Sequence, residues 1–228
     1  MNLLVIAAHP DDEVLGCGGT IARYAREGNR VRILILGEGA ASRFDDPKDA
    51  VADLKTLHEQ ARAAGKLLGA ERVELSKFPD NRFDTVPLLD IVKTIEREVE
   101  EFKPEIVCTQ HGGDLNIDHE RTFRAALTAT RPMAGSTVKR VYAYAVPSST
   151  EWAFQKFSPV FRPNVFVDIR NTLENKVEAM ALYRGESRAF PHPRSAEALR
   201  AHAHYWGSAS GVPAAEAFEL IFEVRSIG

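Results

Sequence analysis

Near its N-terminus the sequence reads Leu3-Leu4-Val5-Ile6-Ala7-Ala8-His9-Pro10-Asp11-Asp12-Glu13. Six apolar residues, typical of a buried strand, run directly into a cluster of ionisable side chains. In open α/β sheets, ligands bind outside the carboxyl ends of the parallel strands. We therefore expect the side chains that follow Ala8 to form a site at that edge of a sheet.

The rest of the chain supports this fold class, because short apolar runs alternate with longer segments of helical periodicity. The expected strands are Leu3 to Ala8, Val31 to Leu36, Arg72 to Leu75, Glu105 to Thr109 and Val141 to Ala145. Helices are expected at about 17–28, 49–69, 86–102 and 119–130. The pattern predicts an α/β, Rossmann-like core at about 1–145, with a mostly parallel sheet and helices on both faces.

After Pro147 this alternation loosens, and prolines punctuate the sequence. We expect a smaller, irregular C-terminal extension at about 146–228 that belongs to the same domain, so that 1–228 forms one unit. The extension should contain a strand near Val165 to Ile169, helices near 171–184 and 195–206, and a last strand near Phe218 to Val224.

Composition argues against several classes of protein. Of the 228 residues, 44% are hydrophobic and 27% are charged, and the net charge of −3 gives no sign of a nucleic-acid partner. The first apolar run is far shorter than the roughly 20 residues that span a bilayer, and it lacks the basic start of a signal peptide. We expect a cytoplasmic protein, without a membrane or nucleic-acid partner, in which Cys17 and Cys108 are reduced.

A second polar cluster follows the strand expected at Glu105 to Thr109. It runs from His111 to Glu120 and contains Asp118-His119 at the start of the next expected helix. By itself, Asp118 would more often cap that helix and leave His119 at the surface. Two such clusters at one sheet edge instead suggest a metal site, since imidazole and carboxylate suit zinc or ferrous iron and catalytic sites typically use three protein ligands.

These motifs resemble those of the PIG-L/LmbE family of metal-dependent N-deacetylases, whose hallmarks are Ala-His-Pro-Asp-Asp-Glu after the first strand and a later Asp-His before a helix. Both occur here, as Ala8 to Glu13 and as Asp118-His119. The resemblance covers about 1–145 well and implies a zinc ion bound by His9, Asp12 and His119. It also implies Asp11 as general base and an N-acetylated amino sugar, or its glycoside or conjugate, as the small-molecule substrate.

Hydrolytic chemistry agrees with these roles, because a bound metal lowers the pKa of water and a carboxylate can take up the proton. One position departs from the family pattern: many members carry a histidine three residues before the ligand histidine, where this chain has Asn116. Asparagine can donate to an oxyanion but cannot protonate a leaving amine. We predict that His111 supplies this proton, oriented by Asp114 or Asp118, with His192 as the rival donor.

Residues at other expected strand ends are candidates for substrate binding. Arg43 lies beyond the second strand, and Asp80, Asn81 and Arg82 follow the third. His192 and Arg194 belong to a basic, proline-constrained stretch that we expect to form a rim over the site. For the segment after the third strand, ordinary turn chemistry is an equally good explanation. We expect Trp152 and Trp206 to be packing residues.

Other functions remain open at this stage. The same metal and base would serve an amidase that cleaves a larger sugar-linked amide conjugate, whereas two-metal phosphoesterases need more ligands. A catalytically silent sugar-nucleotide binding module would share the fold, but it would not need Asp11. The sequence leaves the exact substrate, the choice of zinc or ferrous iron, and homo-oligomerisation undecided.

Overall fold

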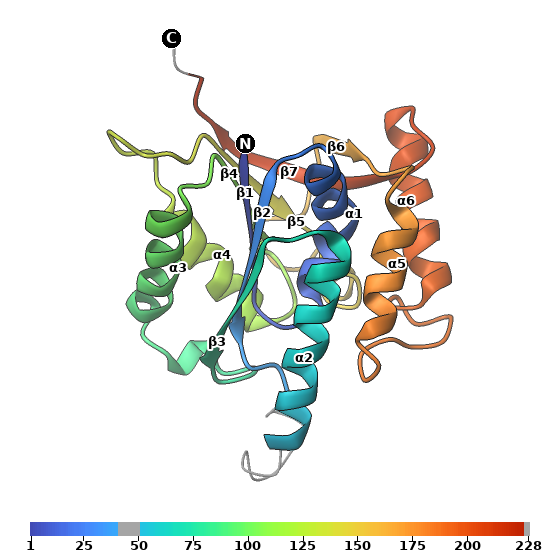
Figure 1. Ribbon diagram of the computed structural model, residues 1–228, viewed down its shortest axis with the longest axis horizontal. Helices are drawn as coiled ribbons and strands as arrows, with labels where there is room; N and C mark the ends of the chain where they lie inside the picture. Colours follow the sequence, from blue (N-terminus) through green and yellow to red (C-terminus); the bar gives the residue numbers. More distant parts are fainter. Residues whose placement is uncertain (41–50, 226–228) are drawn as a thin grey trace.

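The computed structural model describes residues 1–40 and 51–225. Within them, seven strands form one sheet in the order β3-β2-β1-β4-β5-β7-β6 (Figure 1). All neighbouring pairs are parallel except those that β7 makes with β5 and β6. The strands are β1 (Asn2–Ala7), β2 (Arg30–Gly37), β3 (Arg72–Phe78), β4 (Ile106–Gln110), β5 (Arg140–Tyr144), β6 (Val165–Asp168) and β7 (Ala215–Glu223).

Helices cover both faces of this sheet. On one face lie α1 (Asp12–Arg26), α2 (Val51–Leu68), α5 (Leu173–Leu182) and α6 (Ala196–Ser210); on the other lie α3 (Leu88–Phe102) and α4 (Ile117–Ala129). Side chains of β1 alternate between the two cores, as the period of a strand requires: Leu3 and Val5 face the first, and Leu4 and Ile6 the second. Because β1 is buried on both faces, its apolar run is continuous.

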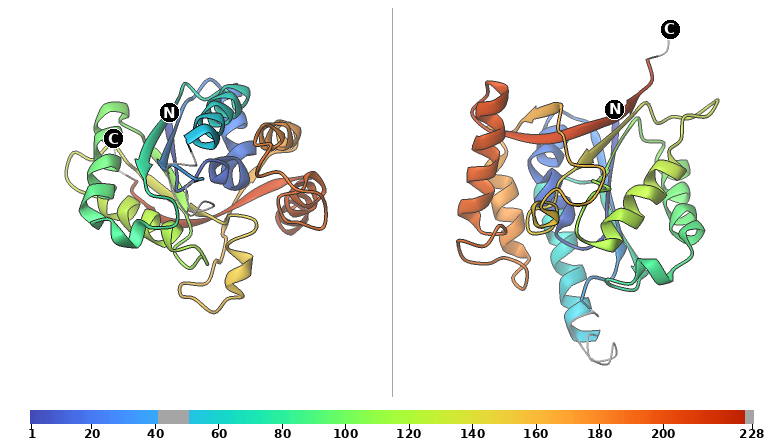
Figure 2. Two further views of the ribbon diagram at one scale, coloured as in Figure 1. Left: turned by 90° about the horizontal axis from the view of Figure 1, so that it is seen from below. Right: turned by 180° about the vertical axis from the view of Figure 1, so that it is seen from behind.

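The predicted fold class is confirmed. The five strands expected in the core and the helices expected at 49–69, 86–102 and 119–130 all form, with ends shifted by at most three residues. In the C-terminal part, β6 and β7 extend the same sheet, and α5 and α6 join the layer of α1 and α2. Irregular structure is concentrated between β5 and β6, where the chain loops out beside the sheet and includes the short helix η4 (Glu151–Ala153) (Figure 2).

The first helix departs from the prediction, because it begins at Asp12 and not near residue 17. The glycine-rich segment Gly16-Cys17-Gly18-Gly19, which in the sequence is typical of a tight turn, lies inside α1. A Cβ at Gly16 would lie 2.1 Å from the Tyr144 ring, and one at Gly19 would lie 2.8 Å from Ile169. These glycines therefore let the helix approach β5 and the segment after β6 closely, and they reflect packing and not a turn.

Because Tyr144 is buried and donates a hydrogen bond from its hydroxyl to the Ile6 carbonyl at 2.7 Å, its ring cannot move aside easily. Gly16→Ala is therefore expected to lower the free energy of unfolding by about 2 kcal/mol, despite alanine's better helix propensity. Gly18→Ala is the matched control on the same helix, since its Cβ would meet no atom closer than 3.0 Å. Urea unfolding would measure both. Equal stability of the two variants would contradict the close approach at Gly16.

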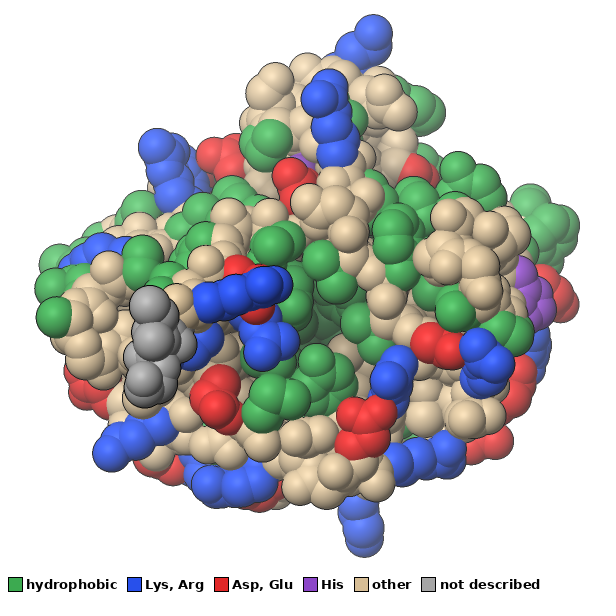
Figure 3. All heavy atoms as spheres, turned by 90° about the horizontal axis from the view of Figure 1, so that it is seen from above, with side chains coloured by type: hydrophobic (Ala, Val, Ile, Leu, Met, Phe, Trp, Pro, Cys, Tyr) green, Lys and Arg blue, Asp and Glu red, His purple; other side chains and the backbone are tan. Residues whose placement is uncertain are grey.

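Charged side chains of both signs are interspersed on the face drawn in Figure 3. Several ion pairs join charged side chains of the described residues, among them Arg30 with Glu71 at 2.7 Å and Arg140 with Glu223 at 3.4 Å. Among the helices of residues 1–40 and 51–225, none combines the length and hydrophobicity needed to cross a bilayer.

Candidate metal and catalytic site

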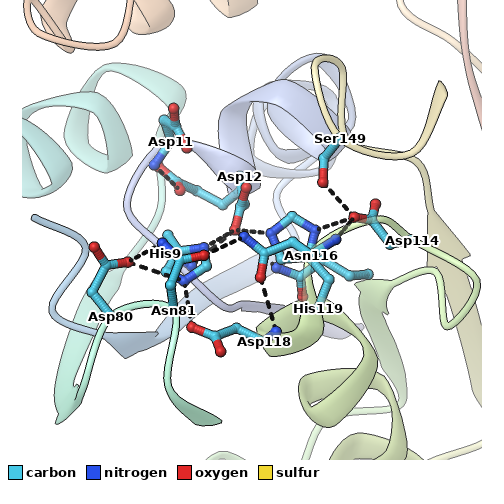
Figure 4. Close-up of polar contacts among 12 residues, drawn as sticks. His9, Asp11, Asp12, Asp80, Asn81, Asp114, Asn116, Asp118, His119 and Ser149 are labelled. Atoms are coloured by element: carbon cyan, nitrogen blue, oxygen red, sulfur yellow. Dashed lines mark hydrogen bonds and ion pairs between the residues drawn. The ribbon is translucent and has the colours of Figure 1, made fainter. Parts of the chain in front are cut away.

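Two short loops bring the main polar motifs together at the carboxyl edge of the sheet. β1 ends at Ala7 and α1 begins at Asp12, so His9 and Asp12 lie on either side of one tight turn. β4 ends at Gln110, and α4 begins at Ile117, which places His119 in the first turn of that helix. β1 and β4 are adjacent parallel strands, and the side chains of His9, Asp12 and His119 therefore converge (Figure 4).

The geometry of this trio fits one metal ion. Asp12 Oδ2 lies 3.5 Å from His9 Nδ1 and 3.3 Å from His119 Nε2. Donors held at about 2.0–2.2 Å from a tetrahedral ion lie roughly 3.4 Å apart, which agrees with these separations. Carboxylate and imidazole are ligands for zinc and for ferrous iron alike, so the donor set does not distinguish the two metals.

A second group of donors, His9, Asp80 and Asp118, lies close together as well. His9 Nε2 is 2.9 Å from Asp118 Oδ2 and 3.4 Å from Asp80 Oδ1. Asp118 is fully buried, and its other oxygen accepts a hydrogen bond from the backbone N–H of Phe83 at 2.8 Å. Asp118 is thus placed to fix the orientation of the His9 ring, which leaves Nδ1 facing Asp12.

Each histidine is in fact supported by a carboxylate on the side away from Asp12. His119 Nδ1 lies 3.1 Å from Asp114 Oδ1, and Asp114 also accepts hydrogen bonds from the hydroxyls of Ser149 and Thr150. Carboxylate partners of this kind fix the tautomer and the ring orientation of metal-binding histidines. From the sequence, we expected Asp114 to orient His111. Its contacts with Ser149 and Thr150 could not be predicted, because these residues come from a distant segment.

These contacts shift the pKa values of the metal-free site. Burial lowers the pKa of His119, but the charges of Asp12 and Asp114 outweigh it and raise the pKa to about 9. The pKa of His9 is raised well above its ordinary value, since hydrogen bonds to Asp118 and Asp12 outweigh the effect of burial. The pKa of Asp12 is lowered correspondingly, because the two histidines overcome its burial.

Asp11 lies beside this trio and precedes α1. Its backbone has a φ of 106°, a conformation that non-glycine residues rarely adopt and that is costly unless the surroundings impose it. The Asp11 N–H donates to Glu13 Oε2 at 3.0 Å, and Glu13 Oε1 accepts from the Tyr183 hydroxyl at 2.5 Å. Burial raises the pKa of Glu13 to about 7. The Tyr183 and Glu13 pair helps to hold the turn.

The Asp11 carboxylate has a basic partner from the C-terminal part of the chain. Arg194 donates from Nη1 to Asp11 Oδ2 at 2.7 Å and to Glu186 Oε2 at 2.8 Å, and from Nε to the Ser148 hydroxyl at 2.7 Å. Burial raises the pKa of Asp11 well above its ordinary value, although the charge of Arg194 opposes the shift. The structure therefore places Arg194, a predicted substrate-binding residue, against Asp11.

The structure does not bring His111 into this cluster. Its Nε2 donates to the Pro159 carbonyl at 2.8 Å, its Nδ1 lies 3.5 Å from Glu219, and its ring contacts Phe123 and Phe161. The imidazole is almost completely buried among these groups. Contacts from three distant segments hold it, and none of them could be seen in the local sequence.

Asn116 caps α4, where Asp118 had been the candidate cap. The Asn116 side chain accepts from the Asp118 N–H at 2.9 Å and donates from Nδ2 to Asn81 Oδ1 at 3.0 Å. Asp118 instead faces His9, and His119 is buried and not at the surface. The helix start was thus predicted correctly within two residues, and the cap that local sequence alone would assign to Asp118 is Asn116.

A cleft of about 140 Å³ opens over the convergent donors. The residues that line it come from loops and helix starts far apart in the sequence: His9, Pro10, Asp11, Asp12, Gly39, Asp80, Asn81, Asn116, His119, Ser148, Ser149, Glu186 and Arg194. Arg82 is exposed at the turn after β3 and does not line this cleft, and neither does His192, whose Nδ1 accepts from the Arg194 N–H. Arg43 lies outside the described residues.

Carboxylates outnumber cationic side chains in the lining of the cleft, which favours the binding of a cation.

Comparison with known proteins identifies the family of this chain. Residues 4–130 match the family described as PIG-L, GlcNAc-PI de-N-acetylase, and these residues include both histidine-containing motifs. The chain belongs to the PIG-L family. The sequence resemblance is thereby confirmed, and the match covers more than half of the chain.

Relatives of known name are also similar over most of their length. An uncharacterised deacetylase of Escherichia coli, YaiS, is 30% identical over 74% of this chain and 82% of its own length. The 1D-myo-inositol 2-acetamido-2-deoxy-alpha-D-glucopyranoside deacetylase of Mycobacterium sp. strain JLS is 25% identical over 85% of this chain and 77% of that protein.

Solved structures agree on the fold. The conserved protein TT1542 of Thermus thermophilus is 26% identical, with a TM-score of 0.76 over 99% of this chain and 96% of the other. GalB, the 4-carboxy-2-hydroxymuconate hydratase of Pseudomonas putida KT2440, is 21% identical, with a TM-score of 0.75 over 100% and 98%. A hydratase with this fold means that the fold alone does not specify the reaction.

Substitution of the metal donors tests the ligand set. His9→Ala, Asp12→Ala and His119→Ala are each expected to lose bound metal, because each removes one of three protein ligands. Asp118→Asn should keep metal but bind it about 10- to 100-fold more weakly, as expected for a supporting carboxylate. Metal content after dialysis, measured by mass spectrometry, decides both points. Full occupancy in any alanine variant would remove that residue from the set.

Metal uptake should release protons, because His119, with a pKa of about 9, is protonated in the metal-free protein near neutral pH and must lose its proton to bind metal. Affinity should therefore rise with pH up to about 9. Calorimetric titration in buffers of different ionisation enthalpy counts the protons. Asp114→Asn should reduce the count, since it removes one charge that raises the pKa of His119. Uptake without proton release would contradict these protonation states.

Proposed function

We propose that the protein is a metal-dependent hydrolase that removes the acetyl group from the amide nitrogen of an N-acetylated amino sugar or its glycoside. Zinc is the proposed metal, with ferrous iron as the alternative. The observation that carries the proposal is the position of Asp11, a buried carboxylate of raised pKa at the cleft beside three convergent donors. The deacetylase named for the mycobacterial relative supports the substrate class.

When bound, the metal polarises the acyl carbonyl and makes water acidic enough to attack at neutral pH. Asp11 takes up the proton of the attacking water, and its raised pKa suits this role because a catalytic base works best when its pKa is close to the operating pH. As the C–N bond breaks, the protonated Asp11 returns this proton to the amine. The water oxygen leaves in acetate, and one carboxylate thus performs the step first assigned to His111.

Two further residues line the cleft in positions suited to transition-state stabilisation. Arg194 holds Asp11 at 2.7 Å and adds positive charge where negative charge develops on the substrate. Asn116 uses one amide hydrogen for Asn81, which leaves its second for an oxyanion, in the place where many family members carry histidine. Asp80 and Asn81 at the same cleft are proposed to contact sugar hydroxyls.

The alternatives differ in what they need from the site. An amidase acting on a larger sugar-linked conjugate would use the same ligands and base, with a different group on the acyl side. A silent sugar-nucleotide binding module would not require Asp11 to be held in a strained conformation beside the metal ligands. The retention of this costly arrangement favours catalysis.

The test is to incubate the metal-loaded protein with N-acetylglucosamine, its methyl glycoside and diacetylchitobiose, and to measure released acetate and primary amine. Both products should form in equal amounts. Asp11→Asn should keep the metal and lose about 10²- to 10⁴-fold in kcat, because an amide cannot accept the proton. Undiminished turnover in that variant would refute the assignment of the base. Metal binding without acetate from any substrate would favour the silent module.

A further inference from the structure

A second cavity, of about 390 Å³, lies between the segment that links β5 to β6 and the helix α6. It is distinct from the metal cleft, since the two share no lining residue. Its walls are mainly apolar and include Ala153, Phe157, Val160, Phe161, Ala198 and Trp206. Cavities of this size and composition are typical of small-molecule sites, which range over about 300–1,000 Å³.

Only a thin partition separates the cavity from the metal cleft. At three places in the chain, neighbouring residues face opposite sides of it: Pro147 and Ser148, Ser149 and Thr150, and Pro193 and Arg194. Asp114 stabilises this partition, because it accepts hydrogen bonds from the hydroxyls of both Ser149 and Thr150 and also contacts His119. A molecule with its amide in the cleft therefore lies one residue's width from the cavity.

The polar side chains of Glu151, His202 and Trp206, which line the cavity, already have hydrogen-bond partners within the protein, so they do not require a charged ligand. His202 Nε2 accepts a hydrogen bond from Trp206 Nε1 at 3.0 Å, which requires the neutral imidazole. The Glu151 carboxylate turns back to accept from the Ser148 N–H at 2.6 Å. Phe157, which lines the cavity, is 50% exposed, so part of the apolar wall faces solvent. Exposed apolar surface of this kind is typical of a ligand-binding site.

We propose that this cavity binds an apolar substituent of the amino-sugar conjugate whose amide lies in the metal cleft. The inference rests on the proposed function and names the substrate class more closely: an amphiphilic conjugate with a sugar part and an alkyl or aryl part. The cleft, at about 140 Å³, has room for the amide and its immediate surroundings, and the larger cavity takes up the apolar group. A folded protein partner would not enter a space of this size.

Three substrates separate the sources of the apolar group: methyl N-acetylglucosaminide, octyl N-acetylglucosaminide, and methyl glucosaminide with an N-octanoyl group. We expect kcat/KM to be about tenfold or more higher for one octyl-bearing substrate than for the methyl N-acetyl reference, because burial of successive methylenes accumulates free energy. Preference for the octyl glycoside assigns the cavity to the group on the anomeric oxygen. Preference for the N-octanoyl substrate assigns it to the acyl chain.

Ala198→Phe fills the cavity, and Ala201→Phe is the matched control, since Ala201 is exposed on the same helix and does not line it. Ala198→Phe should reduce the preference for the octyl-bearing substrate about fivefold or more, with kcat/KM for the methyl reference unchanged. Val160→Trp, from the opposite wall, repeats the test should the first variant fold poorly. A preference that survives in a folded cavity-filling variant, or its absence from the wild type, would overturn the proposal.

A binding measurement keeps this inference separable from the proposed function. Octyl glucoside, which has no amide, is titrated into the metal-free protein below its micelle-forming concentration while tryptophan fluorescence is followed, because Trp206 lines the cavity. Saturable binding that Ala198→Phe weakens and Ala201→Phe does not would support the cavity even if no substrate released acetate. Turnover of the methyl substrate without saturable octyl glucoside binding would refute the cavity and leave the deacetylase intact.

Discussion

One oxygen atom, Oδ2 of Asp12, contacts residues at the ends of two strands and at the start of a second helix. It accepts hydrogen bonds from the His9 N–H at 2.8 Å and from Gln110 Nε2 at 3.0 Å, and it faces the rings of His9 and His119. His9 follows β1, Gln110 ends β4, and His119 lies in the first turn of α4. A carboxylate buried to this extent would be strongly destabilising without such partners. The relative positions of β1, β4, α1 and α4 therefore depend on satisfying this charge.

Strain and electrostatic repulsion accumulate around that atom. Asp11 has an unfavourable φ, and the carboxylates of Asp11, Asp12 and Glu13 are consecutive and buried. Basic side chains lie among these carboxylates: Arg194 beside Asp11, and His9 and His119 beside Asp12. A divalent ion in the place of the histidine protons would serve the same electrostatic purpose. The surplus of buried carboxylates thus favours a cation at this site.

Sequence reasoning succeeded where the determinant is local. The apolar run of β1 and the adjacent polar turn were enough to predict the strand and the sheet edge. The second polar cluster, at 111–120, added the expected convergence of His119 with His9 and Asp12. Sequence reasoning failed where contacts from distant segments decide the outcome. Contacts with Pro159 and Phe161 keep His111 out of the cleft. Arg194 donates hydrogen bonds to Asp11 and Glu186. The Tyr144 ring leaves no room for a Cβ at position 16. Asn116 is an intermediate case, since asparagine before an apolar helix start is a recognisable cap.

The chemistry and the proposed specificity come from different parts of the chain. Residues 4–130, which match the PIG-L family, contain Asp11 and every proposed metal ligand. The apolar cavity is lined almost entirely by residues after 144, on the irregular segment between β5 and β6 and on α6. Loops on a rigid scaffold can change with less cost to folding than the buried strand ends that carry the charges. Ser149, Thr150 and Arg194 link this later part to Asp114 and Asp11, so the partition keeps its place beside the groups that orient His119 and the base.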